Sequence, residues 1–235
     1  MTGALFLAEF DTVEVGQRIS VGGEEARHAT VKRIELGEEV VVANGRGLGF
    51  AGPVRGVTRE ELVVEVARVL RDAPARRVVA VQALAKGDRS LLAVQMLTEV
   101  GAHQIVAWQS DRCIVRWSGE RGEKSLAKWT ATARESAKQA RRLTTPDVLP
   151  ATNRTLGKLL VGVGTILVLH EAADRHIRDA EIVGDVAVVV GPEGGISPDE
   201  LAMLAGLGGQ PVRISDHVLR TSTAGAVAIG QLEVL

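Results

Sequence analysis

The chain has 235 residues and contains few residues that can cross-link or bind zinc. Its single cysteine, Cys113, excludes an internal disulfide framework and a multi-cysteine zinc site, and is expected to fill space in the core. No apolar run approaches the ~20 residues needed to cross a bilayer. The apolar stretch at 4–8 is followed at once by Glu9 and Asp11, so it does not resemble a signal peptide. We therefore expect a soluble protein of the cytoplasm.

Several common catalytic and binding motifs are also missing. There is no G-x-x-x-x-G-K-[ST] loop, no G-x-G-x-x-G between a strand and a helix, and no G-x-S-x-G turn. The five histidines are scattered, and no His, Asp or Glu cluster has the spacing of metal ligands. These absences argue against a nucleoside triphosphate site, a dinucleotide site, a serine hydrolase and a metal centre.

Charge is nearly balanced overall but unevenly distributed. The formal net charge is −1, yet residues 112–142 contain nine basic and three acidic side chains. Such a run can be a solvated helix face, and its segregation in a near-neutral protein favours a surface that binds phosphates.

The first part of the chain has a β pattern. Short β-type runs at 13–19, 39–43 and 62–66 are separated by glycine-rich turns, and Asn44-Gly45 is a typical hairpin turn. We expect a small, mostly β barrel that ends near residue 72, followed by a linker at 71–74.

The second part alternates buried strands with helices. Continuous apolar runs at 78–84, 105–108, 166–169 and 186–190 predict parallel strands in an α/β domain. A helix after Asp88 is expected to bury Leu92, Met96 and Val100. A second, basic helix is expected to bury five residues spaced for one face: Leu126, Trp129, Ala133, Ala137 and Ala140.

A glycine-rich loop follows the last of these strands. Gly191-Pro192-Glu193-Gly194-Gly195 leads into Ser197-Pro198-Asp199-Glu200, a capping box with proline at the first helical position. Ligands of open α/β sheets bind at the carboxyl ends of strands, and glycines let a ligand lie against the backbone. The alternative is a tight strand-to-helix connection without a ligand.

A second segment, Ile214 to Ala224, joins an apolar run to an Ala/Gly-rich helix. Within it, Arg220 stands between apolar Leu219 and the helix start. An arginine in this place is either paired with a carboxylate or directed at an anion, and the sequence leaves both open.

Together these segments resemble a known family. Gly191 to Ser197, with Leu219 to Ala224, resembles the signature of SPOUT methyltransferases, and within that class the bacterial 16S ribosomal RNA uridine N3-methyltransferase family. The resemblance extends over nearly the whole chain through seven further motifs: Arg27-His28, Lys86-Gly87-Asp88, Thr98 to Gly101, Ser110-Asp111-Arg112, Arg116-Trp117, Glu135 with Gln139, and Arg142.

The resemblance implies a fold of two domains and a homodimer. A PUA-like β-barrel that binds RNA (1–72) would precede a SPOUT methyltransferase domain (73–235), an α/β parallel-sheet domain whose C-terminal segment forms a trefoil knot. The sequence departs from the family pattern at five positions: Ala140, Arg141, Asp216, His217 and Ser222.

The resemblance also implies the site residues. S-adenosyl-L-methionine would be the cofactor, and no metal would be used. Uridine N3 becomes negatively charged as its proton leaves, so a fixed cation beside the base would stabilise this charge, and we expect Arg220 to take that role. The RNA partner, 16S rRNA within the small ribosomal subunit, would be held by Arg27, His28, Arg112, Arg116, Lys128, Arg134, Lys138, Gln139 and Arg142. The cofactor would be enclosed by Leu169, His170, Glu171, Gly191, Pro192, Glu193, Gly194, Gly195, Ile196, Ile214, Val218, Leu219 and Thr223.

Two other functions compete with this interpretation. One is a different SPOUT enzyme, such as a transfer-RNA ribose 2′-O-methyltransferase. The other is a non-catalytic RNA-binding or assembly factor that keeps the fold.

Overall fold

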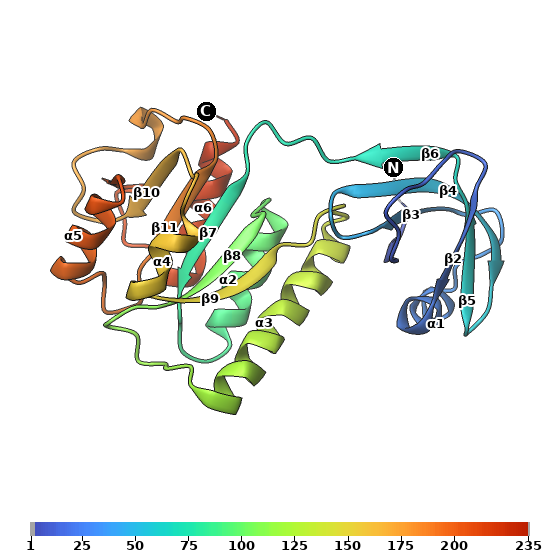
Figure 1. Ribbon diagram of the computed structural model, residues 1–235, viewed down its shortest axis with the longest axis horizontal. Helices are drawn as coiled ribbons and strands as arrows, with labels where there is room; N and C mark the ends of the chain where they lie inside the picture. Colours follow the sequence, from blue (N-terminus) through green and yellow to red (C-terminus); the bar gives the residue numbers. More distant parts are fainter. Residues whose placement is uncertain (1–2, 235) are drawn as a thin grey trace. The chain divides into compact units, whose positions relative to one another are not determined.

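The computed structural model describes residues 3–234, and the chain divides into two compact units (Figure 1). Unit 1 comprises Met1–Pro74 and Ala137–Thr145, and unit 2 comprises Ala75–Ser136 and Pro146–Leu235. The sequence assigns 137–145 to the second domain, whereas this segment groups with unit 1. The reason is burial, because Leu143 packs in an apolar cluster with Leu5, Leu7 and Ala43.

Unit 1 is built on a mixed sheet of six strands. Their order is β1-β3-β4-β5-β2, with β6 paired to β4, and all of these pairs are antiparallel except β1 with β3. The elements are β1 (Leu5–Leu7), β2 (Arg18–Gly22), α1 (Gly23–Val31), β3 (Glu39–Ala43), β4 (Leu48–Val57), β5 (Glu61–Glu65) and β6 (Arg68–Arg71).

The structure confirms two of the three predicted strands here, as β3 and β5. The prediction of a strand at 13–19 is wrong, because Gly16 has a φ of 87° and donates its N–H to the Val66 carbonyl at 2.8 Å. The chain turns at this point and β2 begins at Arg18. The Asn44-Gly45 hairpin turn is confirmed, and the Asn44 carboxamide accepts the N–H of Leu48 at 3.1 Å. The helix α1 was not anticipated.

Unit 2 contains a parallel sheet of six strands in the order β12-β10-β11-β7-β8-β9. Every neighbouring pair is parallel. The strands are β7 (Val78–Ala83), β8 (Gln104–Gln109), β9 (Asp147–Thr152), β10 (Thr165–Leu169), β11 (Val186–Val190) and β12 (Gly209–Val212). The helices are α2 (Arg89–Glu99), α3 (Gly119–Gln139), α4 (Asn153–Leu159), α5 (Pro198–Gly206) and α6 (Thr221–Leu232), with a short 3₁₀ turn η1 (Ile177–Asp179).

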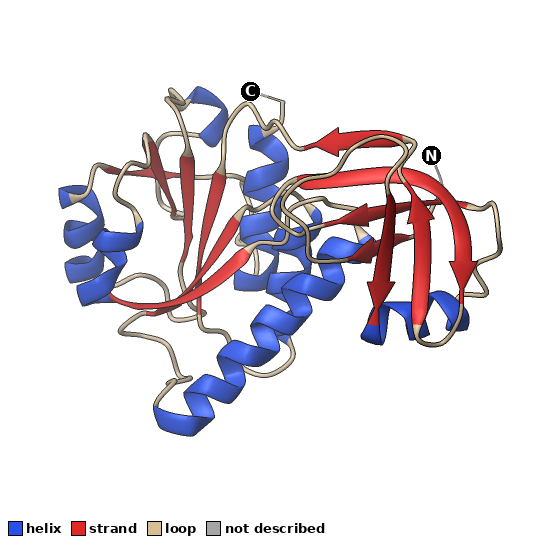
Figure 2. Cartoon of the chain, turned by 45° about the vertical axis from the view of Figure 1, so that its right-hand side comes forward, coloured by secondary structure: helices blue, strands red, loops and turns tan. Residues whose placement is uncertain are grey.

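The four predicted buried strands are confirmed as β7, β8, β10 and β11. They are apolar throughout because helices cover both faces of the sheet. Figure 1 shows α4 and α5 on one side and α2 and α6 on the other, and Figure 2 shows the strands between the helices.

Two of the predicted helix faces need correction. In α2 the buried residues are Ala93, Val94, Leu97 and Thr98, whereas Leu92 is 45% exposed. The helix is rotated from the expected face because α2 packs on α6, where Leu97 lies against Gly225.

In α3, Trp129, Ala133 and Ala137 are buried as predicted. Ala140 lies beyond the end of the helix and is exposed, because Arg141 adopts a φ of 56° as the chain leaves the helix.

The predicted fold class is confirmed as a small β-rich domain followed by an α/β domain with a parallel sheet. The resemblance of the first domain to a PUA barrel and the trefoil knot in the second stay predictions.

Candidate functional site

Three loops of unit 2 meet at one edge of the parallel sheet. β10 lies between β12 and β11, and all three strands run in the same direction. Their carboxyl ends therefore lie side by side, which brings the loops at 169–171, 191–196 and 214–219 together. Ligands of α/β sheets bind at such an edge.

A cleft of about 310 Å³ lies between these loops. A smaller hollow of about 70 Å³ shares six of its lining residues and continues it toward the end of β12. The larger part is lined by Arg89, Leu169, His170, Glu171, Val190, Gly191, Pro192, Glu193, Gly195, Ile196, Val218, Leu219, Arg220, Thr221 and Ala224.

The backbone of the glycine loop forms one wall of this cleft. A Cβ at Gly191 would lie 2.7 Å from Cγ1 of Ile196, so a side chain does not fit there. Gly195 has a φ of 73° and donates its N–H to the Pro192 carbonyl at 2.9 Å, which closes the turn. The glycines are needed to form this loop and also leave its backbone open to a ligand.

The capping box after the loop is confirmed and does more than start α5. Ser197 accepts the N–H of Glu200 at 3.2 Å, and the Glu200 carboxylate accepts the N–H of Ser197 at 2.9 Å. The other carboxylate oxygen of Glu200, which is 1% exposed, accepts the N–H of Asp111 at 2.8 Å. Glu200 therefore holds the loop after β8 against the glycine loop.

Arg112 strengthens the same connection. Its guanidinium donates to the Gly194 carbonyl at 3.0 Å, and the side chain lies where a Cβ at Gly194 would point. Gly194 consequently faces Arg112 and is not part of the cleft lining.

A buried hydrogen-bond chain supports the loop from below. The Thr221 hydroxyl donates to the Gly191 carbonyl at 2.7 Å and accepts from the Gln82 carboxamide at 3.0 Å. Gln82 is fully buried in β7. The first residue of α6 is thereby tied to both the loop and the sheet.

Most of the residues predicted to enclose a cofactor do line the cleft or its continuation, including Ile214. Gly194 and Thr223 do not line either part. Arg220, predicted to be catalytic, lines the cleft and is exposed at the N-cap of α6. The sequence leaves Arg220 either paired with a carboxylate or directed at an anion. Within residues 3–234 Arg220 forms no ion pair, so the structure does not support pairing with a carboxylate.

Four lining residues of the cleft are not among the predicted site residues: Arg89, Val190, Thr221 and Ala224. Arg89 opens α2, and its neighbours Lys86-Gly87-Asp88 were noted only as part of the resemblance. Thr221 was noted within a motif but given no role. Arg89 and Thr221 each lie next to or within a motif that the resemblance names, and this position in the sequence could have identified them as cleft residues.

The predicted RNA-binding residues of unit 2 differ in what their side chains contact. The Arg116 guanidinium donates to the carbonyls of Ser110 at 2.8 Å and Asp111 at 2.6 Å, so it braces this loop. Lys128 and Arg134 are exposed on α3.

The predicted RNA-binding residues of unit 1 are Arg27, His28, Lys138, Gln139 and Arg142. Arg27 and Gln139 are exposed, whereas the His28 ring packs edge-on against Phe6 with centroids 5.9 Å apart. Burial lowers the pKa of Arg142, although the neighbouring Asp72 carboxylate opposes this shift.

The prediction for Lys138 is wrong. Its side chain is 5% exposed, and its ammonium lies 2.8 Å from the Glu25 carboxylate of α1. The amphipathic pattern of α3 did not reveal this, because the last residues of the helix belong to unit 1 and the partner lies more than a hundred residues earlier. Lys138 holds the helix end in place and is too buried to contact a phosphate.

At the positions that depart from the family pattern, the structure shows local contacts. Asp216 forms an ion pair with Arg213 at 2.7 Å, and Ser222 is 4% exposed at the start of α6. Within residues 3–234, no three His, Cys, Asp or Glu side chains are grouped so that they could hold a metal ion. In the same range, no helix combines the length and apolar character required to cross a bilayer.

Comparison with known proteins agrees with this geometry. A family model described as RNA methyltransferase domain matches residues 71–233. A relative from Mycobacterium bovis, the ribosomal RNA small subunit methyltransferase E, is 42% identical over 231 residues, which are 94% of this chain and 88% of that protein. The chain belongs to the ribosomal RNA small subunit methyltransferase E family. The Bacillus subtilis member of the methyltransferase E family is 25% identical over 94% of this chain and 91% of its own.

Solved structures have the same fold. The methyltransferase E of Neisseria gonorrhoeae, bound to S-adenosyl methionine, superimposes with a TM-score of 0.88 at 24% identity, over 99% of this chain and 98% of that one. A Legionella pneumophila protein in complex with the same cofactor has a TM-score of 0.85 at 26% identity, over 100% and 98% of the two chains. The SPOUT assignment of the fold therefore holds for this member of the methyltransferase E family.

Proposed function

We propose that this protein transfers a methyl group from S-adenosyl-L-methionine to N3 of a uridine in the 16S rRNA of the small ribosomal subunit. The observation that carries the proposal is the cleft at the carboxyl ends of β10, β11 and β12, walled by a glycine loop that leaves its backbone open. Membership of the methyltransferase E family and the two cofactor-bound structural neighbours support it.

The cleft residues fit S-adenosylmethionine. Leu169, Ile196, Val218 and Leu219 offer apolar walls for an adenine ring, and backbone groups of the three loops are available for its polar edge. The volume of about 310 Å³ lies at the lower end of small-molecule sites. When bound, the cofactor supplies an electrophilic methyl group on a sulfonium sulfur.

The chain must then make uridine N3 reactive. N3 carries a proton and becomes negatively charged as that proton leaves, so a fixed cation beside the base lowers the barrier. Arg220 lines the cleft and is exposed at the start of α6, which suits it to this role. Much of the remaining acceleration comes from holding the base and the methyl group in line.

The RNA is proposed to contact exposed cations of both units, among them Arg27, Lys128 and Arg134, with Arg142 as a further candidate. Such contacts to phosphates set the register of the RNA and carry little sequence information. Unit 1 is proposed to act as a PUA-like RNA-binding domain. We further propose a cytoplasmic homodimer that uses no metal.

Methyl transfer to defined RNAs tests the proposal. Labelled S-adenosylmethionine is incubated with small subunits, naked 16S rRNA and tRNA, and the modified atom is mapped by mass spectrometry of the nucleosides. We expect 3-methyluridine in 16S rRNA. A ribose 2′-O-methyl group in tRNA would instead establish the rival enzyme class, and failure to bind the cofactor by calorimetry would support a non-catalytic assembly factor.

A further inference from the structure

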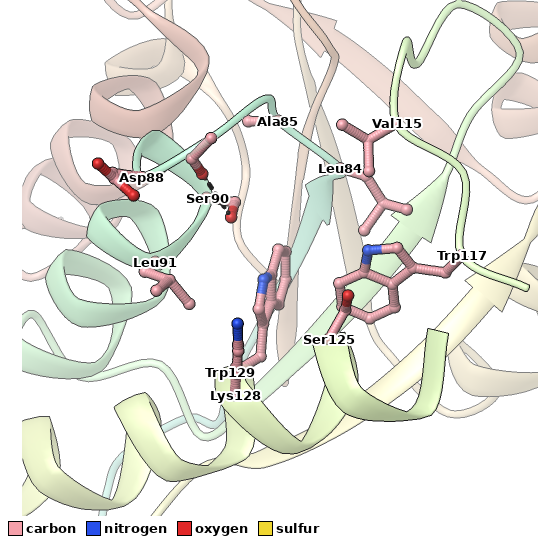
Figure 3. Close-up of a pocket in the computed structure, with 11 residues that line it drawn as sticks. Leu84, Ala85, Asp88, Ser90, Leu91, Val115, Trp117, Ser125, Lys128 and Trp129 are labelled. Atoms are coloured by element: carbon pink, nitrogen blue, oxygen red, sulfur yellow. Dashed lines mark hydrogen bonds between the residues drawn. The ribbon is translucent and has the colours of Figure 1, made fainter. Parts of the chain in front are cut away.

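A second cavity of unit 2, of about 270 Å³, lies beside the end of β7 (Figure 3). It has an apolar interior and a polar rim, and most of its wall comes from the β7–α2 loop, the segment before α3, and α3 itself. It is lined by Leu84, Ala85, Gly87, Asp88, Ser90, Leu91, Val115, Trp117, Ser125, Lys128 and Trp129.

Two indoles form one side of this cavity. Trp117 and Trp129 pack edge to face, with ring centroids 5.1 Å apart and planes at 82°. Trp129 is 2% exposed, yet within residues 3–234 neither of these two indole N–H groups has a hydrogen-bond acceptor. Trp108 differs, because its indole N–H donates to the Asn153 carboxamide at 2.8 Å. Trp117 is half-buried, and neither indole nitrogen is among the fully buried atoms that lack a partner, so both N–H groups are open to the cavity or to solvent and can donate to a ligand with acceptor atoms.

The rim adds charge and further donors. Figure 3 shows Lys128 beside Trp129, with Ser125 near Trp117. Lys128 is exposed, and the Ser90 hydroxyl donates to the Gly87 carbonyl at 3.1 Å, which leaves its oxygen able to accept. A planar ring with carbonyl oxygens, attached to a phosphate, matches this combination of apolar walls, N–H donors and one cation.

The cavity is a close neighbour of the proposed methyl-transfer cleft. β7 and β11 pair in parallel, so their carboxyl ends lie side by side. Gly87, Asp88 and Ser90 line the cavity, whereas Arg89 between them lines the cleft. Because consecutive Cα atoms are about 3.8 Å apart, a single chain segment separates the two spaces.

We propose that this cavity receives an unpaired uracil base of the RNA. The inference rests on the proposed function and adds a subsite to it. The uracil ring packs against the indoles, its two carbonyl oxygens accept from the indole N–H groups, and Lys128 pairs with its phosphate. Base stacking on aromatic side chains and recognition of splayed-out bases are common in single-stranded RNA binding.

Tryptophan fluorescence tests the proposal directly, because two of the three tryptophans line the cavity. Uridine monophosphate and a short oligouridine are titrated into the full chain. We expect saturable quenching that persists in Trp108→Phe and falls strongly in Trp117→Phe. Absence of saturable quenching by oligouridine in the wild type would overturn the proposal.

A cavity-filling variant separates this subsite from the cleft. Ser125→Leu places a larger side chain in the cavity, and Ala127→Leu, on an exposed position of the same helix, is the matched control. We expect Ser125→Leu to weaken oligouridine binding and raise the KM for RNA about tenfold, as for the loss of one stacked base. S-adenosylmethionine affinity stays unchanged in both variants. If Ser125→Leu is unstable on heating, Trp129→Phe replaces it, since it removes the N–H while keeping a ring.

The outcomes distinguish failure of the subsite from failure of the proposed function. An unchanged KM and unchanged oligouridine affinity in Ser125→Leu, with methyl transfer intact, would overturn the subsite alone. Loss of methyl transfer in the wild type would overturn the function. Photo-crosslinking with 5-bromouridine placed at the methylated position or at its neighbours then identifies which uracil reaches Trp117, and either result supports the pocket.

Discussion

The Thr221 hydroxyl donates a hydrogen bond of 2.7 Å to the Gly191 carbonyl, which joins the first residue of α6 to the first residue of the glycine loop. The same hydroxyl accepts from Gln82 at 3.0 Å, so three segments far apart in the sequence meet at one oxygen. The Gln82 carboxamide oxygen, also buried, has no hydrogen-bond partner within residues 3–234. The Thr221 hydroxyl is therefore a polar link between the sheet and the proposed cofactor loop.

Thr221→Val is therefore expected to loosen the loop. The variant keeps the shape of the side chain but leaves the Gly191 carbonyl without this donor, which costs ~1–3 kcal/mol. We expect S-adenosylmethionine affinity to fall about tenfold, measured by calorimetry, with modest loss of thermal stability. Thr130→Val is the control, because its hydroxyl bonds to Leu126 within its own helix. Equal cofactor affinity in both variants would contradict the argument.

Arg220→Ala is expected to lower the methylation rate with little change in cofactor affinity. The guanidinium is proposed to act on charge that develops on the base during transfer, and loss of one such group typically costs about 10²–10³ in rate. Single-turnover kinetics with saturating RNA and cofactor measures this effect. Arg154→Ala, an exposed arginine on α4, is the control. A normal single-turnover rate in Arg220→Ala would rule out the assigned role.

Two lysines of α3 are expected to respond in opposite ways. Lys138→Ala breaks a buried ion pair with Glu25, which costs ~3–5 kcal/mol of folding free energy because the buried carboxylate loses the lysine ammonium. Lys128→Ala removes an exposed cation and should leave stability unchanged. Chemical denaturation measures the first effect.

The effect of Lys128→Ala on RNA binding is measured by the salt dependence of the binding affinity. Lys128→Ala should reduce the slope of log affinity against log salt by ~1, as expected for one lost phosphate contact. A stable Lys138→Ala protein with a reduced salt slope would restore Lys138 as an RNA contact and refute the structural assignment.

Glu65 links the stability of unit 1 to pH. Hydrogen bonds from Arg55 at 3.1 Å and from Arg18 at 3.3 Å lower the pKa of Glu65 below its ordinary value of 4.5. The folded state thus favours the ionised carboxylate, and this stabilisation is present above the ordinary pKa and disappears as pH falls through the lowered one.

Glu65→Gln is accordingly expected to lower the Tm by a few degrees at neutral pH, and the difference from wild type should vanish in acid. The effect is small because the groups are exposed to solvent. Melting curves from neutral pH to pH ~3 check it, with Glu60→Gln as an exposed control. A difference that grows as the pH falls would have the wrong sign.

Sequence patterns were sufficient wherever local rules decide the structure. The apolar runs of β7, β8, β10 and β11 predicted a parallel sheet, because a strand covered on both faces has no polar side. The box at Ser197 and Glu200 predicted the start of α5, because its two hydrogen bonds join residues three apart. The glycine loop and the segment around Arg220 identified the cleft for the same reason, since each motif is local.

Only the tertiary structure decided which side chains are available for function. Lys138 resembles an RNA contact in the sequence, and its burial depends on Glu25, a residue of the same unit that lies far away in the sequence. Arg116 is held by backbone carbonyls, and Arg89 enters the cleft because β7 lies beside β11. The Trp117–Trp129 cavity arises where α3 returns to the end of β7. Such contacts depend on packing between segments that are distant in the sequence. Hydrophobic periodicity predicts that a residue is buried, but it does not predict which segment packs against that residue.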